Sequence, residues 1–499
     1  MVLGKIFSAL EGIFRSKEEL DLTGGPVKKN LFYLSLPVVM INLLQTAYNL
    51  ADTFWLGQFS QTALEAITFA FPLIFLLVSF GLGISVAGSV LVAQLEGSGK
   101  KDRRNYAASQ TLAFAAIGSL VLGGLGYFFI GEIVGMMGAS GATATAATNY
   151  LEIVSLGIFA FFGFIVFQSL MRGYGDTLTP MVLMFGTVVL NVVLDPVMIF
   201  GWGPFPRMGV TGAAYATIFS RMLALSIGLW MLFTGRRGIQ VSLEDMRPDM
   251  KFFRKMLAIG VPASIEGGGR ATSVNLLVAI VGIFFSGTVV AGYGIGVRIF
   301  SMVFLPATAV GRAVESMTGQ NIGAGEFDRA ARTARAGALY SFLLLEALGV
   351  LTFLFAEPIA SVFTTEQDVA MAGASFLRIV SLSFGCLGIQ RAYTGSFRGA
   401  GKTVVAGIIS VGALGVVRLP IAYYSALEIG VNGVWAAFFI SNVAGAAVSY
   451  LWYRKGTWKQ RITDQGNGGE ASGESRSRIL YVFEALKNLF AGSPSGKKA

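Results

Sequence analysis

The sequence predicts an all-α integral membrane protein of about twelve transmembrane helices, in two parallel six-helix bundles related by a pseudo-two-fold axis along the membrane normal. Three observations predict this fold class. The composition is strongly apolar, apolar runs of about twenty residues recur along the chain, and one motif occurs twice.

The composition is that of a membrane protein. Hydrophobic residues make up 54% of the chain and charged residues only 13%, whereas a soluble protein carries roughly a quarter charged residues to keep its surface hydrated. The mean hydropathy of +0.66 agrees with this interpretation. A soluble globular fold is therefore excluded.

The apolar runs predict the transmembrane helices, because each is long enough to cross a hydrocarbon core of about 30 Å. The runs begin near Phe32, Ala66, Tyr106, Tyr150, Pro180, Gly209, Leu257, Thr288, Ala334, Ala370, Thr403 and Gly430. Six spans per half return the chain to its starting side, so the halves must be parallel rather than inverted.

The duplication is visible in residues 94–103, QLEGSGKKDR, which return as QNIGAGEFDR at 320–329, 226 positions later (320 − 94 = 226). Further pairs keep nearly the same offset: Pro37 with Pro262, Arg172-Gly173 with Arg398-Gly399, and 209–212 with 430–433. Isolated coincidences would not share one register. Duplicated halves in so apolar a chain are typical of transporters.

The lysines and arginines predict the orientation, because cytoplasmic loops of membrane proteins are enriched in them. The basic positions that fall on one side are Lys28, Lys29, 100–104, Arg172, 236–255, 329–335, Arg398, Lys402 and 454–461. We expect a multi-pass protein of the cell membrane with both termini in the cytoplasm. The net charge of +10 is then a topology signal, and no nucleic-acid partner is expected.

The expected organisation has five parts: an N-terminal interfacial segment (1–30), an N-lobe of six helices (31–234), a cytoplasmic linker (235–256), a C-lobe of six helices (257–455) and a cytoplasmic tail (456–499). Apolar residues recur at helical spacing in both terminal segments, which is typical of helices on a membrane surface. For the amphipathic helix of the tail, binding to a partner protein is the alternative.

Polar residues inside two predicted spans are candidates for an ion-coupling site. Gln45, Asn49 and Asp52 are spaced i, i+4 and i+7, so they share one face of the first helix. Asn191 and Asp195 share one face of the fifth helix. Both helices start in the cytoplasm and both acids lie past the midpoints, so we expect the acids at similar depth in one site.

Burial of a carboxyl group favours its protonated form, and so does a second carboxylate nearby. The pair Asp52 and Asp195 is therefore predicted to hold a proton or to exchange it for Na⁺. The chain has no histidine, which leaves carboxylates as the obvious proton carriers. The alternative is that each aspartate only forms hydrogen bonds to a neighbouring helix.

The second half lacks counterparts of these acids, since Arg418 stands near the duplicated position. Glu266 lies in the seventh span with Arg270 at i+4, which predicts an ion pair; a functional carboxylate is the alternative. Pro37 is a candidate hinge ahead of the Asp52 face, with a static kink as the alternative.

Catalysis and cofactor binding are not expected. Cys386 is the sole cysteine and histidine is absent, so no thiolate metal site and no nucleophile with a plausible base can be assembled. Residues 396–403 end like a phosphate-binding loop, but serine replaces its first glycine and the segment joins two membrane spans.

The duplicated bundles, Pro37 followed by the Gln45 to Asp52 face, the doubled Gln-x-x-Gly-x-Gly loop and 191–196 together resemble the multidrug and toxic compound extrusion (MATE) family over roughly residues 25 to 455. The prokaryotic DinF-like branch is the most similar. This resemblance implies a cation site of Asp52, Asn191 and Asp195, with Na⁺ or H⁺ as the ion and Thr217 nearby.

The resemblance also implies the activity. We expect a monomeric secondary active antiporter that exports amphipathic or cationic compounds by rocker-switch alternating access and contacts membrane lipids. The alternative is a flippase for lipid-linked oligosaccharides or polysaccharides. A flippase would line its cleft with Arg and Lys for a pyrophosphate, whereas the first-half spans offer acids and amides.

Overall fold

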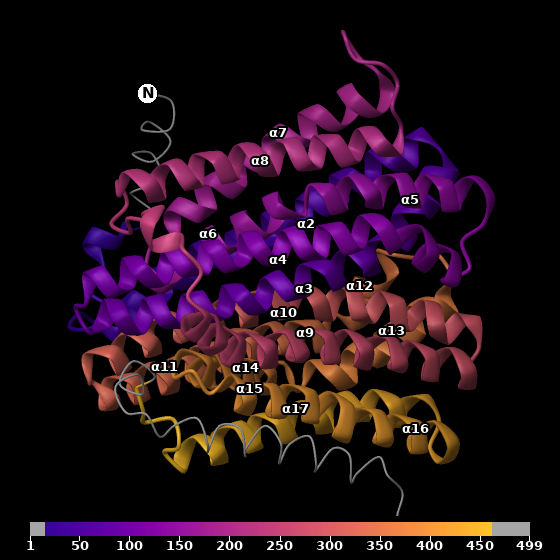
Figure 1. Ribbon diagram of the computed structural model, residues 1–499. Helices are drawn as coiled ribbons and strands as arrows, with labels where there is room; N and C mark the ends of the chain where they lie inside the picture. Colours follow the sequence, from indigo (N-terminus) through magenta and orange to yellow (C-terminus); the bar gives the residue numbers. More distant parts are fainter. Residues whose placement is uncertain (1–14, 462–499) are drawn as a thin grey trace, which may run out of the picture.

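The computed structural model describes residues 15–461, and these residues fold into helices joined by short connections (Figure 1). The helices of the first half, here the N-terminal bundle, are α2 (Val27–Phe59), α3 (Gln61–Gly97), α4 (Lys101–Met136), α5 (Gly141–Leu156), α6 (Ile158–Tyr174), α7 (Leu178–Phe200) and α8 (Val210–Thr234). Two short 3₁₀ turns, η1 (Lys17–Glu19) and η2 (Glu244–Met246), lie before and after this bundle.

The second half forms the C-terminal bundle. Its helices are α9 (Met250–Phe284), α10 (Gly287–Ala324), α11 (Phe327–Leu354), α12 (Ala356–Ser361), α13 (Gln367–Ser381), α14 (Phe384–Gly399), α15 (Thr403–Val411), the π-helical segment η3 (Gly412–Arg418), α16 (Leu419–Glu428) and α17 (Val431–Arg454).

The prediction of about twelve spans is confirmed. Within residues 15–461, ten helices are long and apolar enough to cross a membrane, or up to 12 if each of two bent pairs is one span. The bent pairs are α5 with α6, at 53°, and α13 with α14, at 52°. They occupy the same place in each half, so each half holds six spans. Most of the helices begin a few residues before the apolar runs, because their first turns extend beyond the hydrocarbon region.

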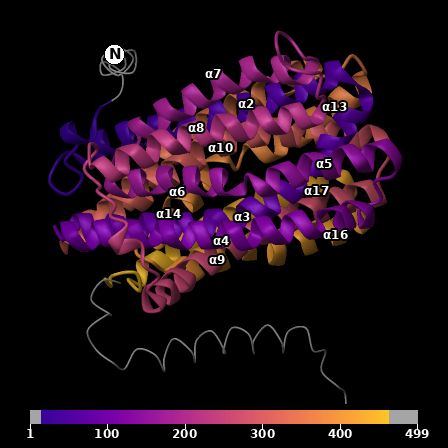
Figure 2. The same ribbon diagram turned by 45° about the horizontal axis from the view of Figure 1, so that its top comes forward.

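The two bundles lie side by side, with α2–α8 in the upper part of Figure 1 and α9–α17 in the lower part; in the turned view of Figure 2 the two bundles overlap. Across the interface, α3 contacts α9 and α10, and α2 contacts α10. Each bundle has its own large apolar clusters. The cluster that joins α3 to α9 is smaller and includes Leu91, Met256 and Ile259. A larger cluster packs Leu31 and Leu34 of α2 against α10, α11 and α14, so apolar packing also joins the two bundles.

The doubled motif lies where the two bundles meet. A Cβ atom on Gly97 would lie 1.8 Å from the backbone oxygen of Gln320, and a Cβ atom on Gly323 would lie 2.0 Å from the backbone oxygen of Gln94. Only glycine permits this approach. Because each half makes the same contact with the other, the halves are related by a two-fold axis that passes between these segments.

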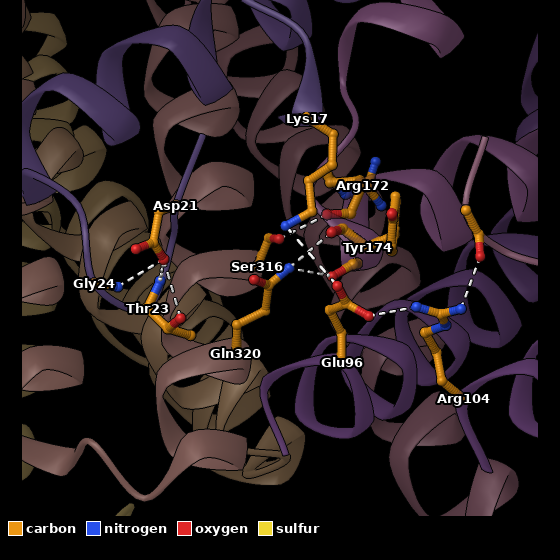
Figure 3. A network of polar contacts seen from close by, with 12 residues as sticks. Lys17, Asp21, Thr23, Gly24, Glu96, Arg104, Arg172, Tyr174, Ser316 and Gln320 are labelled. Carbon is orange, nitrogen blue, oxygen red and sulfur yellow. Dashed lines mark hydrogen bonds and ion pairs between the residues drawn. The ribbon is translucent and has the colours of Figure 1, made fainter. Parts of the chain in front are cut away.

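All of these contacts are at one end of the bundles, here called the basic end, which carries the connections at 98–100, 175–177, 235–249, 325–326 and 400–402. Residues 15–26 pack there as well (Figure 3). Lys17 lies 3.9 Å from Glu96 of the N-terminal bundle. The backbone oxygen of Leu22 accepts hydrogen bonds from Asn321 at 3.1 Å and Arg329 at 3.3 Å in the C-terminal bundle. This segment thus connects the two bundles.

Asp21 stabilises the turn in this segment. Its Oδ1 atom accepts a hydrogen bond of 2.8 Å from the backbone N–H of Gly24 and another from Thr23. The Gly24 bond is the largest cause that holds the pKa of Asp21 below its ordinary value. The turn therefore gains stability from the ionised carboxylate.

The structure also bears on the expected limits of the terminal segments and linker. The linker ends at Asp249, whose carboxylate accepts hydrogen bonds from Lys251 N at 2.8 Å and Phe252 N at 3.2 Å and so caps α9. At the other end, Trp458 is buried and stacks on Tyr453, which extends the packed chain beyond the predicted start of the tail. The predicted surface helices fall largely on residues 1–14 and 462–499, outside the described residues.

Candidate functional site

The structure brings Asp52, Asn191 and Asp195 together inside the N-terminal bundle, because α2 packs against α7. Asp52 is 6% exposed and the other two are fully buried. The Nδ2 atom of Asn191 donates a hydrogen bond of 3.1 Å to Oδ1 of Asp195. The carboxyl groups of Asp52 and Asp195 lie close enough to interact with each other. Two carboxyl groups this close favour at least one proton or cation between them.

Sequence spacing explains how α7 presents its pair. Asn191 and Asp195 are one turn apart, so both side chains point from the same face of the helix. Pro196 follows directly inside α7 and supplies no backbone N–H, which loosens the helical hydrogen bonding at the level of the acid.

Several buried oxygen atoms at this site have no hydrogen-bond partner among the described residues. They are Asp52 Oδ1, Asn191 Oδ1, Asp195 Oδ2 and Thr217 Oγ1. Buried polar atoms in proteins are nearly always paired, so an unpaired group of them needs an explanation. Carboxylate, amide and hydroxyl oxygens are suitable ligands for a proton or a hard monovalent cation. The residues present therefore fit the H⁺ or Na⁺ site that the sequence predicts.

A divalent metal site is less well matched. Within residues 15–461, no three His, Cys, Asp or Glu side chains gather closely enough to hold a metal ion. The site has only two acidic groups, Asp52 and Asp195, and the remaining oxygens are neutral.

Thr217 lies at the site, as the resemblance implied. Tyr48 from α2 and Tyr150 from α5 are both buried and lie beside Thr217 and the two carboxyl groups. Four helices, α2, α5, α7 and α8, therefore supply the site. Tyr150 was not predicted, because an aromatic residue in an apolar span gives no polar pattern.

Arg221 is the main functional candidate that the sequence analysis missed. It is 5% exposed on α8 and lies one turn after Thr217. Its Nη2 atom donates a hydrogen bond of 2.7 Å to Gln45 Oε1, and its guanidinium lies 4.8 Å from the ring centre of Tyr48. Asp52 lies close enough to interact with its charge. The i, i+4 spacing of Thr217 and Arg221 inside a span was the signal that could have found it.

The other predicted residues of the first helix lie at different distances from the acids. Gln45 joins the site through Arg221 and donates a hydrogen bond of 3.0 Å to Asn49 Oδ1. Asn49 is exposed and belongs to the margin of the site. Pro37 is buried inside α2, which continues through it as one helix. A hinge at Pro37 stays a prediction.

The expected ion pair of Glu266 with Arg270 needs correction. Glu266 instead accepts hydrogen bonds from Arg398 at 3.2 Å and from Ser410 at 2.7 Å, and Arg391 lies 3.8 Å away. The guanidinium of Arg270 lies 3.7 Å from the ring centre of Phe304. The i, i+4 spacing permits a pair within α9, but α14 brings Arg398 closer and the aromatic ring holds Arg270.

Arg398 joins a second buried acid to this group. Its Nε atom donates a hydrogen bond of 3.1 Å to Glu315 Oε2, and Arg312 lies 3.5 Å from the same oxygen. Glu266 and Glu315 are thus engaged in ion pairs, unlike the aspartates of the N-terminal bundle. This difference favours a structural role for the acids of the C-terminal bundle.

Two six-span bundles with a buried pair of carboxyl groups in one of them define a duplicated membrane transporter. The family model described as MatE matches residues 37–197 and 271–424, one segment in each half. The chain belongs to this family.

Curated relatives and solved structures extend over most of the chain. The probable multidrug resistance protein NorM of Thermotoga maritima is 28% identical over 437 residues, which cover 87% of this chain and 94% of that protein. The FAD transporter of Shewanella oneidensis is 27% identical over 436 residues, with 87% and 96% covered. A multidrug resistance MATE family transporter of the MOP superfamily, solved in an outward-facing conformation, aligns with a TM-score of 0.81 at 26% identity and covers 87% of this chain and 96% of its own.

Proposed function

We propose that this MatE-family transporter is a secondary active antiporter that exports amphipathic or cationic compounds in exchange for H⁺ or Na⁺. The observation that carries the proposal is the buried pair Asp52 and Asp195: Oδ1 of Asp52 and Oδ2 of Asp195 have no hydrogen-bond partner among residues 15–461. Several relatives named as multidrug resistance proteins support the substrate class.

Binding of the ion acts through a change of charge at this pair. With both carboxylates ionised, their negative charges repel each other and attract a cation or a proton. Once the ion is bound, the site is neutral or nearly so. An ion changes the conformational equilibrium only by its difference in affinity for the two states. We propose that the loaded pair favours the state that releases the exported compound outside.

The contacts at the basic end support an assignment of the described conformation. We assign this end to the cytoplasm from its lysines and arginines, and both termini with it. The close approach of Gly97 to Gln320 and of Gly323 to Gln94 closes the bundles there. The described conformation is then outward-facing, in agreement with its likeness to an outward-facing transporter.

The position of the acids favours the DinF-like branch. The N-terminal bundle holds the unpaired carboxyl oxygens, whereas Glu266 of the C-terminal bundle is held by Arg398 and Ser410. Coupling in the N-terminal bundle is the arrangement that the resemblance implied for that branch.

A flippase for lipid-linked oligosaccharides remains the second candidate. The observation that favours an anionic cargo is the set of arginines in the C-terminal bundle, and one relative is named as a transporter of FAD, a negatively charged compound. The acids of the N-terminal bundle favour the antiporter.

Transport into everted membrane vesicles tests the proposal. Ethidium should accumulate inside vesicles when the lumen is made acidic or rich in Na⁺, and it should leave when the gradient is collapsed by an ionophore. Separate H⁺ and Na⁺ gradients identify the ion. Ethidium movement that ignores both gradients, or movement of lipid-linked oligosaccharide without any dye transport, would contradict the antiporter.

A further inference from the structure

We propose that a cavity inside the C-terminal bundle binds an organic anion that carries an aromatic ring, and that three arginines, Arg270, Arg391 and Arg418, recognise the anionic group. That this anion is also transported rests on the proposed export function. The binding site itself does not depend on it.

The cavity has a volume of about 200 Å³ and lies between α9, α10, α14, η3 and α17. Its wall is largely apolar and aromatic, with Tyr293, Phe300, Phe304 and Phe438, but the three arginines also face it. Cavities for drug-sized ligands measure roughly 300 to 1,000 Å³, so this one suits a compound of one or two rings.

Two of the three arginines, Arg270 and Arg418, form no ion pair with an acid among residues 15–461. Arg418 is 6% exposed, and its hydrogen bonds go to two neutral groups, Ser441 Oγ and Asn442 Oδ1, both at 2.8 Å. Arg270 makes no hydrogen bond or ion pair of 4 Å or less among residues 15–461, and its guanidinium lies over Phe304. A charge inside an apolar wall without an acidic partner is unfavourable, so buried Arg418 and half-buried Arg270 favour a bound anion.

Arg391 supplies an independent sign of a ligand. It is 7% exposed, and its Nε atom has no hydrogen-bond partner among the described residues. Its ion pair with Glu266 is long, at 3.8 Å, and Glu266 is shared with Arg398 at 3.2 Å. The Nε–H group of Arg391 therefore remains available to a ligand in the cavity that this residue lines.

The whole interior cluster carries excess positive charge. It contains the acids Glu266 and Glu315 and five arginines. The arginines are Arg270, Arg312, Arg391, Arg398 and Arg418. Two carboxylates cannot neutralise five guanidinium groups, and the excess lies beside the cavity.

One aromatic ring, that of Phe304, contacts two of these guanidinium groups. Arg270 and Arg391 both lie over Phe304, at 3.7 Å and 4.7 Å from its ring centre. A guanidinium that stacks on a ring keeps its N–H groups free at its edge, where they match the two oxygens of a carboxylate, sulfonate or phosphate. The rings offer the remaining surface to an aromatic body.

The duplicated positions of the two bundles differ in charge. The N-terminal bundle has Asp195 directly before Pro196, and the C-terminal bundle has Arg418 two residues before Pro420. Arg418 ends the π-helical segment η3, and π-helical turns are frequent at functional sites. Equivalent places in the two halves thus suit ligands of opposite charge.

Binding to the purified full-length protein in neutral detergent tests the site without any ion gradient. The probes are 1-naphthoate and the cation 1-naphthylmethylammonium, measured by isothermal titration calorimetry. Naphthoate should bind saturably, and the cation should not compete with it. Arg270→Gln and Arg418→Gln should each weaken naphthoate binding about tenfold or more, since loss of one strong polar contact has that effect on affinity.

The control is Arg378→Gln, which removes one positive charge from the same bundle at an exposed pair with Glu357; it should leave binding unchanged. Arg270→Gln removes no hydrogen bond within the described residues, so it keeps the test valid if Arg418→Gln fails to fold. Absence of naphthoate binding, or equal binding by the arginine variants and the parent, would overturn the proposal.

Anionic lipid headgroups share the chemistry of the proposed ligand, so the measurement is repeated in nanodiscs. Naphthoate should bind in nanodiscs of phosphatidylcholine. If it still binds when phosphatidylglycerol is added, the result supports a soluble organic anion as the ligand. Loss of binding on that addition would assign the site to a lipid and overturn the substrate assignment. If naphthoate binds but ethidium is not transported under any gradient, the antiporter proposal fails and this site stands.

Discussion

Gln94 and Gln320 make the same hydrogen bond in opposite directions across the two bundles. Nε2 of Gln94 donates to the backbone oxygen of Gly399 at 3.0 Å, and Nε2 of Gln320 donates to that of Gly173 at 2.9 Å. Both acceptors belong to the Arg-Gly pairs that the sequence repeats. One duplicated motif thus supplies both halves of the contact that joins the bundles at the basic end.

Replacement of either motif glycine by alanine should disrupt this contact. A Cβ atom at Gly97 or Gly323 would meet backbone atoms at 1.8 Å or 2.0 Å, and backbone cannot move as a side chain can. We expect Gly97→Ala and Gly323→Ala each to lower the free energy of unfolding in detergent by about 1–3 kcal/mol.

Gly124 is the matched control, because it also lies inside a helix but has no atom within 4 Å of the position that a Cβ atom would take. Gly124→Ala should be neutral or stabilising by up to about 1 kcal/mol. Equal stability of all three variants would show that the bundles do not depend on the close approach.

Loss of either glutamine should have nearly the same effect, since the two bonds are equivalent. Gln94→Ala leaves the buried oxygen of Gly399 without this donor, and Gln320→Ala does so for Gly173 and Tyr174. We expect the free energy of unfolding to fall by about 1–3 kcal/mol in each case. The cysteine introduced by Ser316→Cys, in a Cys386→Ala background, should react with a thiol reagent faster in either glutamine variant than in the parent. Faster labelling reports opening of the basic end. Gln61→Ala, which removes an exposed bond to Glu65, serves as control; a large effect there, or at only one of the two glutamines, would contradict the symmetry.

The fold was largely predictable because membrane insertion imposes strong sequence patterns. Every predicted apolar run corresponds to a helix or a bent pair, and the repeat of Gln94 at Gln320 predicted the duplicated halves that this contact joins. The terminal segments were less predictable, because burial of Leu22 and Trp458 depends on surfaces that form only when the bundles assemble.

The candidate site was predictable only in part. The polar spacing of Asp52, Asn191 and Asp195 identified residues that the structure brings together. Arg221 and Tyr150 were missed because their proximity to the acids arises from packing of different helices. The partner of Glu266 was misassigned for the same reason: the spacing within α9 pointed to Arg270, but α14 supplies Arg398.

Glu266→Gln and Asn191→Ala should separate a structural role from a coupling role. Glu266→Gln removes a buried charge that balances Arg398 and Arg391, so we expect it to destabilise the protein by about 3–5 kcal/mol. Ion-driven transport per folded molecule should remain near the parental rate. Asn191→Ala should weaken that transport, because its amide orients Asp195 at 3.1 Å. The opposite order of transport rates, measured in vesicles and normalised to folded protein, would move coupling to the C-terminal bundle.

Asp52→Asn and Asp195→Asn test the coupling pair. Asparagine keeps the shape and hydrogen-bonding capacity of aspartate but cannot ionise, and it removes a buried charge rather than adding one. Each variant should therefore be at least as heat-stable as the parent in detergent. Each should also lose any pH-dependent or Na⁺-dependent shift in substrate affinity, because coupling between two ligands is reciprocal. A variant that fails to fold would instead indicate a structural role for the aspartate.

The most direct measurement is ethidium uptake by proteoliposomes of the parent and the Asp195→Asn variant under the same imposed ion gradient. We expect the parent to accumulate ethidium against its concentration gradient and the folded variant to allow no uphill accumulation. Uphill accumulation by the variant at a near-parental rate would contradict coupling through Asp52 and Asp195.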